Sequence, residues 1–165
     1  AYDFQGNMLY AFGGHGYKAG LFMNPSAIED IGDSLLVTDQ KLGTITQFTL
    51  TDYGKMINDG LAEYKKGNYD ESANIWRKVL KHNGNYDQAY IGIGRALLRE
   101  KNYKEAMDYF ELKLDAKNYS KAFKLYREVW FEENIGTILI IIAILILLGF
   151  GVGFVKKARR EVEKG

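Results

Sequence analysis

The stretch from Ile135 to Val155 constrains the fold of this chain more than any other feature of its sequence. It holds 21 residues without a charged side chain, and Thr137 is its one polar residue. As an α-helix rising about 1.5 Å per residue it is roughly 31 Å long, close to the ~30 Å hydrocarbon core of a bilayer. A buried core helix is the alternative, but such a helix is rarely apolar on every side. Because lipid offers no partner for free backbone groups, we predict one transmembrane helix over residues 135–155.

Charged residues on the two sides of this stretch predict its orientation. Glu132 and Glu133 precede it, whereas residues 156–165 carry five basic and two acidic side chains. Because Lys and Arg are retained in the cytoplasm, we expect the N-terminal region to be extracytoplasmic and the C-terminus to be cytoplasmic. The aromatic pair before the stretch either anchors the helix at the outer membrane interface or packs against residues of the preceding helix. The basic tail either binds anionic lipid head groups or serves only as a stop-transfer signal. The residues expected at the membrane interfaces are Trp130, Phe131, Lys156, Lys157, Arg159 and Arg160.

The charge and composition of the whole chain exclude several classes of function. Its 165 residues carry 22 Lys and Arg against 21 Asp and Glu, a net charge of +1, whereas a nucleic-acid binder is normally strongly basic. The absence of cysteine excludes disulfides, thiolate zinc sites and iron–sulfur clusters. Two histidines, His15 and His82, do not make a poly-His metal centre. We therefore expect no nucleic-acid partner, no metal and no cofactor.

Export of the region before the membrane stretch sets a further expectation. The chain opens on AYDFQGNMLY, which has neither an initiator Met nor a basic-then-apolar secretion signal. Export of 134 residues requires such a signal, so we expect this sequence to be a fragment with a signal, and further exported sequence, upstream. An exported region without cysteine is typical of a bacterial protein that does not rely on disulfides.

Residues 1–57 follow the alternating pattern of β-strands. Segments rich in β-branched residues are separated by Gly and Asp turn signals, and the only proline, Pro25, opens one of them. The spacing predicts short strands over residues 8–12, 27–29, 35–37 and 45–51. We expect one unit of a small antiparallel β region.

Several motifs in this region occur in an order that resembles the NHL repeat of β-propellers. They are Asp3-Phe4-Gln5-Gly6-Asn7, Phe12-Gly13, Gly20-Leu21-Phe22-Met23-Asn24-Pro25 and Leu36-Val37-Thr38-Asp39. The resemblance covers about 55 residues and departs from the family at Lys41-Leu42-Gly43. It implies one propeller blade plus the last strand of its predecessor. A single blade cannot close a propeller, so either further blades lie upstream or this piece packs as a small sheet against the helices.

Residues 58–134 change to helical periodicity and contain an internal repeat. The dipeptide Asn-Tyr recurs at positions 68, 85, 102 and 118, with spacings of 17, 17 and 16 residues. A period of 17 is half of 34, the tetratricopeptide period, with one helix in each half. Asn suits the N-cap of each following helix. The pattern predicts helices over about residues 56–66, 70–82, 86–99, 103–115 and 119–133, with a break near residues 134–136 before the membrane helix.

The run from Lys101 to Phe110 closely resembles the second helix of a tetratricopeptide repeat. The resemblance implies an α-solenoid of helix hairpins in which the first helix of each repeat lines a groove for a protein or peptide partner. Arg95 and Arg99 are four residues apart, so they either grip a carboxylate together or form a solvated face beside Glu100. This surface is also suited to packing against an upstream domain. The groove positions implied by the resemblance are Leu61, Tyr64, Lys65, Ile91, Arg95, Leu98 and Arg99.

Two other groups of residues are candidates for a helix–helix contact and for a cation site. Gly149 and Gly153 form a Gly-x-x-x-Gly spacing, which favours a homodimer through the membrane helix, although Gly is common in such helices in any case. Acidic residues surround the strands at Glu29, Asp30, Asp33 and Asp39, but none belongs to a dense calcium loop, and Asp39 is expected to cap a turn.

The sequence therefore predicts four domains: an NHL-like blade fragment over residues 1–57, tetratricopeptide-like repeats with a capping helix over 58–134, a transmembrane helix over 135–155 and a basic tail over 156–165. The function favoured is that of a non-enzymatic, membrane-anchored scaffold without catalytic residues. Two alternatives stay open. One is a fragment of a lyase-like or lactonase-like propeller enzyme whose catalytic blades lie upstream, and the other is an accessory or sensing subunit of a membrane complex.

Overall fold

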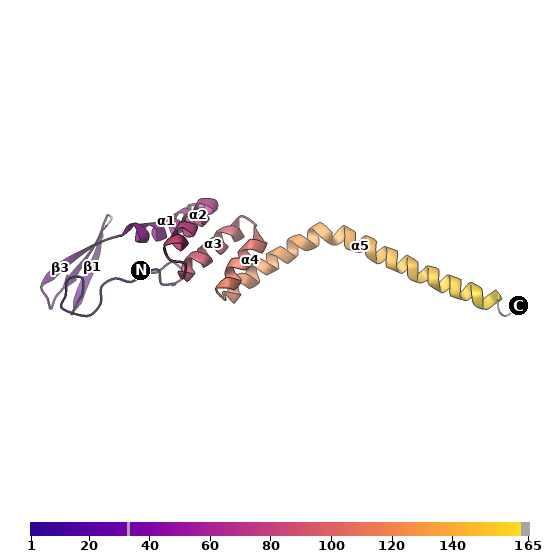
Figure 1. Ribbon diagram of the computed structural model, residues 1–165, viewed down its shortest axis with the longest axis horizontal. Coiled ribbons are helices and arrows are strands. Elements are labelled where there is room, and N and C mark those ends of the chain that lie inside the picture. The colour runs from indigo at the N-terminus through magenta and orange to yellow at the C-terminus, as the bar shows by residue number, and fades with distance from the viewer. Residues whose placement is uncertain (33, 163–165) are drawn as a thin grey trace. The chain divides into compact units, whose positions relative to one another are not determined.

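The computed structural model describes residues 1–32 and 34–162, with the side chains of residues 154, 155 and 157–162 left out of the description. Three strands come first in the chain and five helices follow (Figure 1). The chain divides into two compact units, Ala1–Ala122 and Phe123–Gly165, of which the first contains the sheet and the helical hairpins.

The three strands form one antiparallel sheet in the order β1-β2-β3. They are β1 (Pro25–Ile31), β2 (Ser34–Asp39) and β3 (Thr44–Thr49). Ile28 lies opposite Val37, and Val37 lies opposite Thr46, so these three residues share one face of the sheet. A small antiparallel sheet is therefore confirmed, whereas its membership of a propeller stays a prediction.

The strand predicted over residues 8–12 is wrong. Only one bridge, between Tyr2 and Met8, forms there. Asp3 and Asn7 close a tight turn through a backbone hydrogen bond of 2.9 Å from the Asp3 amide to the Asn7 carbonyl. The chain reverses at this turn, and the segments on its two sides are too short to pair as regular β-strands.

Aromatic packing and one buried carboxylate hold the sheet together. The rings of Phe12 and Phe22 lie 4.8 and 5.7 Å from the ring of Phe48 on β3. Asp39 is 1% exposed and accepts hydrogen bonds from the backbone amides of Met23 at 2.6 Å and of Asn24 and Leu42, both at 2.9 Å. Asp39 therefore caps the turns at the end of β2, as its sequence position predicted. Every residue of β1 is exposed.

Four helices follow the sheet, and each helix packs against the next one along the chain (Figure 1). Consecutive helices therefore form helical hairpins. They are α1 (Asp52–Lys66), α2 (Tyr69–His82), α3 (Asp87–Arg99) and α4 (Tyr103–Leu112). Trp76 and Phe110, the largest fully buried side chains, come from α2 and α4. Both rings lie against glycines of α3, where a Cβ at Gly92 would lie 2.5 Å from Trp76 and one at Gly94 would lie 2.6 Å from Phe110. The small residues of α3 thus make room for the two largest residues of the core.

The helix starts differ in detail from the predicted caps. The Thr51 hydroxyl accepts a 3.2 Å hydrogen bond from the Gly54 amide, so α1 begins at Asp52 rather than near residue 56. Asn68 and Asn102 occupy N-cap positions, but their side chains make no capping bond. Tyr86, and not Asn85, is the N-cap of α3. The Asn-Tyr spacing therefore locates α2, α3 and α4, and the N-cap position predicted for Asn is confirmed at Asn68 and Asn102, although neither side chain makes a capping bond. Asn118 lies inside α5, which begins at Ala116.

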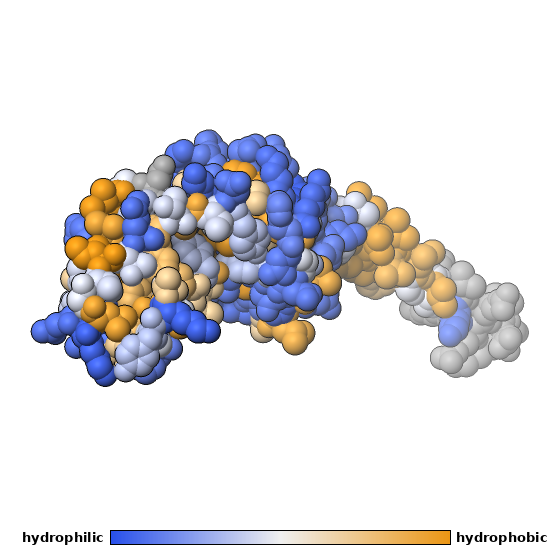
Figure 2. Space-filling view, turned by 60° about the vertical axis from the view of Figure 1, so that its left-hand side comes forward, coloured by the Kyte–Doolittle hydropathy of each residue, from blue (hydrophilic) through white to orange (hydrophobic). Residues whose placement is uncertain are grey.

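The last helix, α5 (Ala116–Val162), has no break where one was predicted near residues 134–136. Asn134 does not end the helix, because its side-chain amide donates a 2.8 Å hydrogen bond back to the carbonyl of Trp130, one turn earlier. From Ala116 to Gly153 this helix is long and apolar enough to cross a membrane by length and composition, and its most apolar window is wholly unburied. Figure 2 shows hydrophobic residues gathered on α5 and hydrophilic residues over the helical hairpins.

Candidate functional site

The predicted groove positions lie on α1 and α3, the first helices of the two hairpins. Leu61, Tyr64, Ile91 and Arg95 are partly exposed, whereas Lys65 and Arg99 are exposed. Leu98 is only 9% exposed and therefore belongs to the core more than to a surface. The face that α1 and α3 share thus combines aliphatic and aromatic area with three cationic side chains.

The first ten residues form a hairpin segment (residues 1–10) that lies against this face. Its turn is closed by the Asp3–Asn7 bond and by a 3.1 Å bond from the Gly6 amide to the Asp3 carbonyl. Gly6 has a φ of +83°, a left-handed conformation that suits glycine. The conformation of the hairpin segment is therefore set mainly by its own backbone.

The carboxylate of Asp3 is the centre of this contact. It accepts hydrogen bonds of 2.8 Å from the amides of Gln5 and Asn7 and one of 2.7 Å from the Asn7 side chain. The Arg95 guanidinium lies 3.5 Å away, and the two side chains are 5% and 16% exposed. Burial acts to raise the pKa of Asp3, but the hydrogen bonds from Asn7 and Gln5 and the charge of Arg95 outweigh it and hold the pKa below its usual 3.8.

Other residues of the hairpin segment complete the contact with α1 and α3. Arg95 donates a second hydrogen bond to the side chain of Gln5, and the ammonium of Lys65 lies 4.9 Å from the centre of the Phe4 ring. Farther along, the Tyr86 hydroxyl donates a 2.8 Å hydrogen bond to the carbonyl of Leu9, whose side chain is buried. The hydroxyl of Tyr10 donates to the Asn58 side chain at 3.3 Å.

The two arginines that share a face take different partners. Arg95 binds the hairpin segment, whereas the Nε of Arg99 donates a 3.1 Å hydrogen bond to the hydroxyl of Tyr64 and so links α3 to α1. No ion pair with Glu100 is formed by either arginine in the described residues. Whether the two arginines grip one carboxylate of a partner stays a prediction; in this structure Tyr64 binds the side chain of Arg99, and Asp3 binds that of Arg95.

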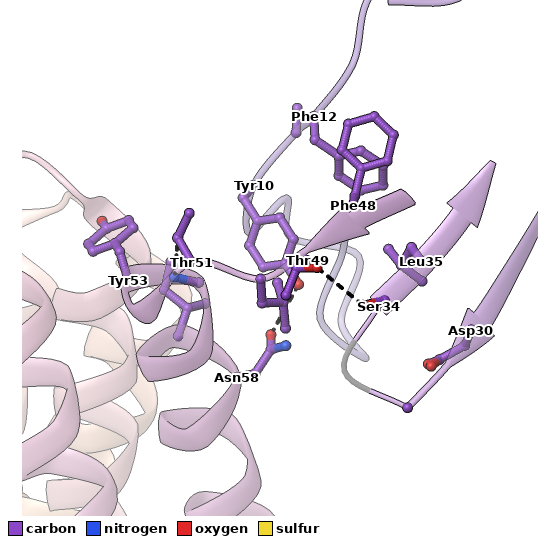
Figure 3. A pocket seen from close by; sticks show the side chains of 15 residues that line it. Tyr10, Phe12, Asp30, Ser34, Leu35, Phe48, Thr49, Thr51, Tyr53 and Asn58 are labelled. Carbon is purple, nitrogen blue, oxygen red and sulfur yellow. Dashed lines mark hydrogen bonds between the residues drawn. The ribbon is translucent and has the colours of Figure 1, made fainter. Parts of the chain in front are cut away.

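A pocket of about 310 Å³ lies between the sheet and the start of α1 (Figure 3). Phe12, Leu35, Phe48 and Ile57 supply much of its apolar lining, and Asp30 is the one charged side chain among the described residues that line it. Figure 3 shows the Tyr10–Asn58 hydrogen bond beside the pocket, together with the Ser34–Thr49 pair, whose hydroxyls lie 3.2 Å apart.

The remaining titratable candidates do not converge on a site. His82 packs edge-on against the ring of Tyr53 at 6.1 Å, and His15 forms an isolated bridge with Phe22. Within residues 1–32 and 34–162, no three His, Asp or Glu side chains gather as metal ligands. Asp33, one of the acidic residues noted near the strands, lies outside the described residues.

The predicted membrane residues lie along α5. Trp130 and Phe131 are 43% and 49% exposed, with their rings edge-on at 5.5 Å, and Lys156 is exposed. The side chains of Lys157, Arg159 and Arg160 lie outside the described part. At Gly149 and Gly153 no described atom lies within 4 Å of an added Cβ, so both faces are open to a neighbour.

Sequence reasoning missed Asn58 and Tyr86, and it missed that the hairpin segment lies on the groove. Tyr86 was noted only as part of the repeated Asn-Tyr dipeptide. The polar turn Asp3-x-x-Gly6-Asn7 is a turn signal that was visible in the sequence. Its docking partner was not visible, because Asp3 and Arg95 are 92 residues apart.

Comparison with known proteins supports the helical hairpins. Residues 58–121 match the tetratricopeptide repeat family. This match covers α2, α3 and α4 and most of α1, so the predicted repeats are confirmed. The comparison with curated proteins found no match, and the comparison with solved structures found none either.

Proposed function

We propose that this protein is a non-enzymatic, single-pass membrane protein whose extracytoplasmic repeats recognise a protein partner. The recognition part rests on the tetratricopeptide repeats, because such repeats typically bind protein segments. Exposed Lys65 and Arg99 and half-buried Ile91 give the face of α1 and α3 the mixture of charge and apolar area that a peptide requires.

The observation that carries the membrane part is the exposure of α5. Apart from the partly exposed Ile138, its large apolar side chains between Ile135 and Val152 are 46% to 75% exposed in the described residues. A stretch of this kind is unstable in water, and at 21 residues it matches the thickness of a bilayer. The acidic residues before it and the basic residues after it favour an extracytoplasmic N-terminal region and a cytoplasmic C-terminus.

Membrane extraction and protease access test the proposed topology. Expressed in bacterial cells behind a cleavable secretion signal, which export of the N-terminal region requires, the full chain should stay in the membrane fraction after carbonate washing. Protease added to spheroplasts should digest the region before residue 135 and spare a tag placed after Gly165. Release by carbonate contradicts the anchor, and a digested tag with protected repeats contradicts the orientation.

Site-specific crosslinking tests the recognition surface. A photo-crosslinking amino acid replaces Arg99 on the groove, and the matched control replaces Asp108, which is exposed on α4. We expect a protein adduct from position 99 and none from position 108. Equal adducts from both positions, or none from position 99, contradict recognition through this face.

A role as a subunit of a membrane complex is the second candidate. The open faces at Gly149 and Gly153 favour it, because a glycine pair at this spacing lets two helix backbones approach closely. The double variant Gly149→Leu and Gly153→Leu should abolish a detergent-stable complex, whereas Ala143→Leu should not. A complex of unchanged size in the double variant contradicts this candidate.

A further inference from the structure

The hairpin segment is held on the groove by few contacts, although it covers the groove's most buried cation. Its apolar side chains stay in water, with Phe4 89%, Tyr2 68% and Met8 58% exposed. Apart from Leu9, the contact consists of the polar and cation–π interactions with Arg95, Lys65, Tyr86 and Asn58. A segment attached through so little buried apolar area is bound weakly and can be displaced.

The contact also leaves one donor of Arg95 unused. The Nε–H of Arg95 is buried and has no acceptor among the described residues, while its two terminal nitrogens bind Asp3 and Gln5. A buried donor without a partner is costly, and a carboxylate that met Nε and a terminal nitrogen together would satisfy it. The hairpin segment is therefore an incomplete ligand for a site that has capacity for more negative charge.

We propose that the hairpin segment is an intramolecular ligand of the groove, and that a protein partner binds there by presenting an acidic turn of the same kind and displacing it. This inference rests on the proposed recognition function and names the chemistry of the partner. The partner segment carries a carboxylate that closes its own turn, as Asp3 does, and an aromatic residue next to it for Lys65. A second acidic residue at the position of Gln5 meets the unused donor of Arg95.

Attachment to the same chain makes the hairpin segment an effective competitor. A tethered ligand acts at an effective concentration on the order of millimolar, so even weak contacts keep the groove occupied until a better ligand arrives. Release of the hairpin segment should therefore raise the affinity of the groove for an added peptide without any change in the groove itself.

The test measures binding of a fluorescent, acetylated peptide with the sequence of residues 1–10 to the full chain in detergent micelles. The variant Asp3→Ala opens the hairpin segment, and Asp108→Ala on α4 is the matched control, since it removes an exposed carboxylate away from the groove. We expect Asp3→Ala to bind the peptide at least about tenfold more tightly than the unchanged chain or the control. Adding Arg95→Ala to Asp3→Ala should remove that gain.

A second peptide tests the chemistry of the site. With Glu in place of Gln5, the peptide should bind the Asp3→Ala chain about fivefold more tightly, because a hydrogen bond to a charged acceptor is stronger than one to a neutral amide. Equal binding of the original peptide to the unchanged chain and to Asp3→Ala overturns the proposal, and so does a gain that survives Arg95→Ala. The hydrogen-exchange protection of the α3 amides must be the same in all variants. Equal protection shows that a change in peptide binding comes from the binding site and not from unfolding of the repeats.

These outcomes are distinguishable from a failure of the proposed function. A crosslinked partner at position 99 together with no peptide binding to Asp3→Ala refutes the intramolecular ligand and leaves the scaffold intact. Peptide binding by Asp3→Ala without any crosslinked partner supports the intramolecular ligand and counts against the scaffold.

Discussion

Two helices of this protein, α3 and α5, are rich in apolar residues, and they differ in what covers them. In α3, seven of the 13 residues are buried, and the rings of Trp76 and Phe110 lie against its glycines. In α5, the large apolar residues between Ile135 and Val152 are exposed except for Ile138, which is partly exposed, and its most apolar window is 0% buried. An apolar helix needs a cover, and only α3 receives it from protein. This contrast supports the proposal that lipid covers α5.

The largest effect should come from placing charge where lipid is proposed to be the cover. The double substitution Ile142→Arg and Leu145→Arg lies near the middle of the apolar stretch, where each Arg costs about 2.5–3.5 kcal/mol of insertion free energy. We expect the chain to move from the carbonate-resistant membrane fraction to the soluble or aggregated fraction. The double variant Ile142→Leu and Leu145→Ile keeps the apolar character and should behave as the unchanged chain. Retention of the Arg variant in the membrane would mean that protein, and not lipid, covers this part of α5.

The next effect tests the protein cover of α3. Trp76→Ala removes a fully buried ring from between α1, α2 and α3 and should lower the free energy of unfolding of the helical repeats by about 3–5 kcal/mol. The measurement is urea unfolding followed by far-ultraviolet circular dichroism in detergent. Tyr17→Ala is the control, because Tyr17 is 74% exposed and its loss should change stability by no more than about 0.5 kcal/mol. Equal effects of the two substitutions contradict a Trp76-centred core.

The same small substitution should have opposite consequences in the two helices. Gly92→Ala in α3 places a methyl group 2.5 Å from the Trp76 ring, and the overpacking should cost about 1–3 kcal/mol of unfolding free energy. Gly136→Ala in α5 meets no described atom within 4 Å, so the better helix propensity of Ala should leave α5 intact or slightly more stable. Urea unfolding of the two variants side by side provides the comparison. A neutral Gly92→Ala refutes the close approach of Trp76 to α3.

How much of this structure was predictable depends on the distance along the chain over which each signal acts. The Asn-Tyr spacing of 17 residues located α2 to within one residue of its observed start at Tyr69, because helix periodicity is local. The start of α1 was missed by about four residues, since it is set by the hydroxyl of Thr51. The hydrogen bond from Arg99 to Tyr64 was not predicted, because the two residues are 35 positions apart and lie on different helices. The hairpin segment could not be placed on the groove, because no periodicity connects Asp3 with Arg95.

The smallest effect concerns the groove side of α3, which the hairpin segment covers. Because this contact includes the charged side chain of Asp3, its stability depends on pH. Asp3 has a pKa below its usual 3.8, since the hydrogen bonds from Asn7 and Gln5 and the charge of Arg95 outweigh the effect of burial. A carboxyl whose pKa is lowered on folding stabilises the folded state above its unfolded pKa, and this stabilisation is lost as the pH falls through the lowered value. Arg95 and Lys65 are the cations that face the hairpin segment from α3 and α1.

Acidification from pH 5 to below pH 3.8 should therefore release the hairpin segment while α3 keeps its cover from Trp76 and Phe110. The measurement is the hydrogen-exchange protection of the Asn7 amide, which donates to the Asp3 carboxylate, compared with that of Ile93 in the core. Asp39 also has a pKa lowered by hydrogen bonds from the backbone amides around it, so Asp3→Asn is the necessary control. In that variant the protection of Asn7 should be low at pH 5 and independent of pH. If Asn7 and Ile93 lose protection together, the hairpin segment unfolds with the repeat core and is not a separate cover, because a segment that is released by protonation of Asp3 should lose its protection before the helices that it covers.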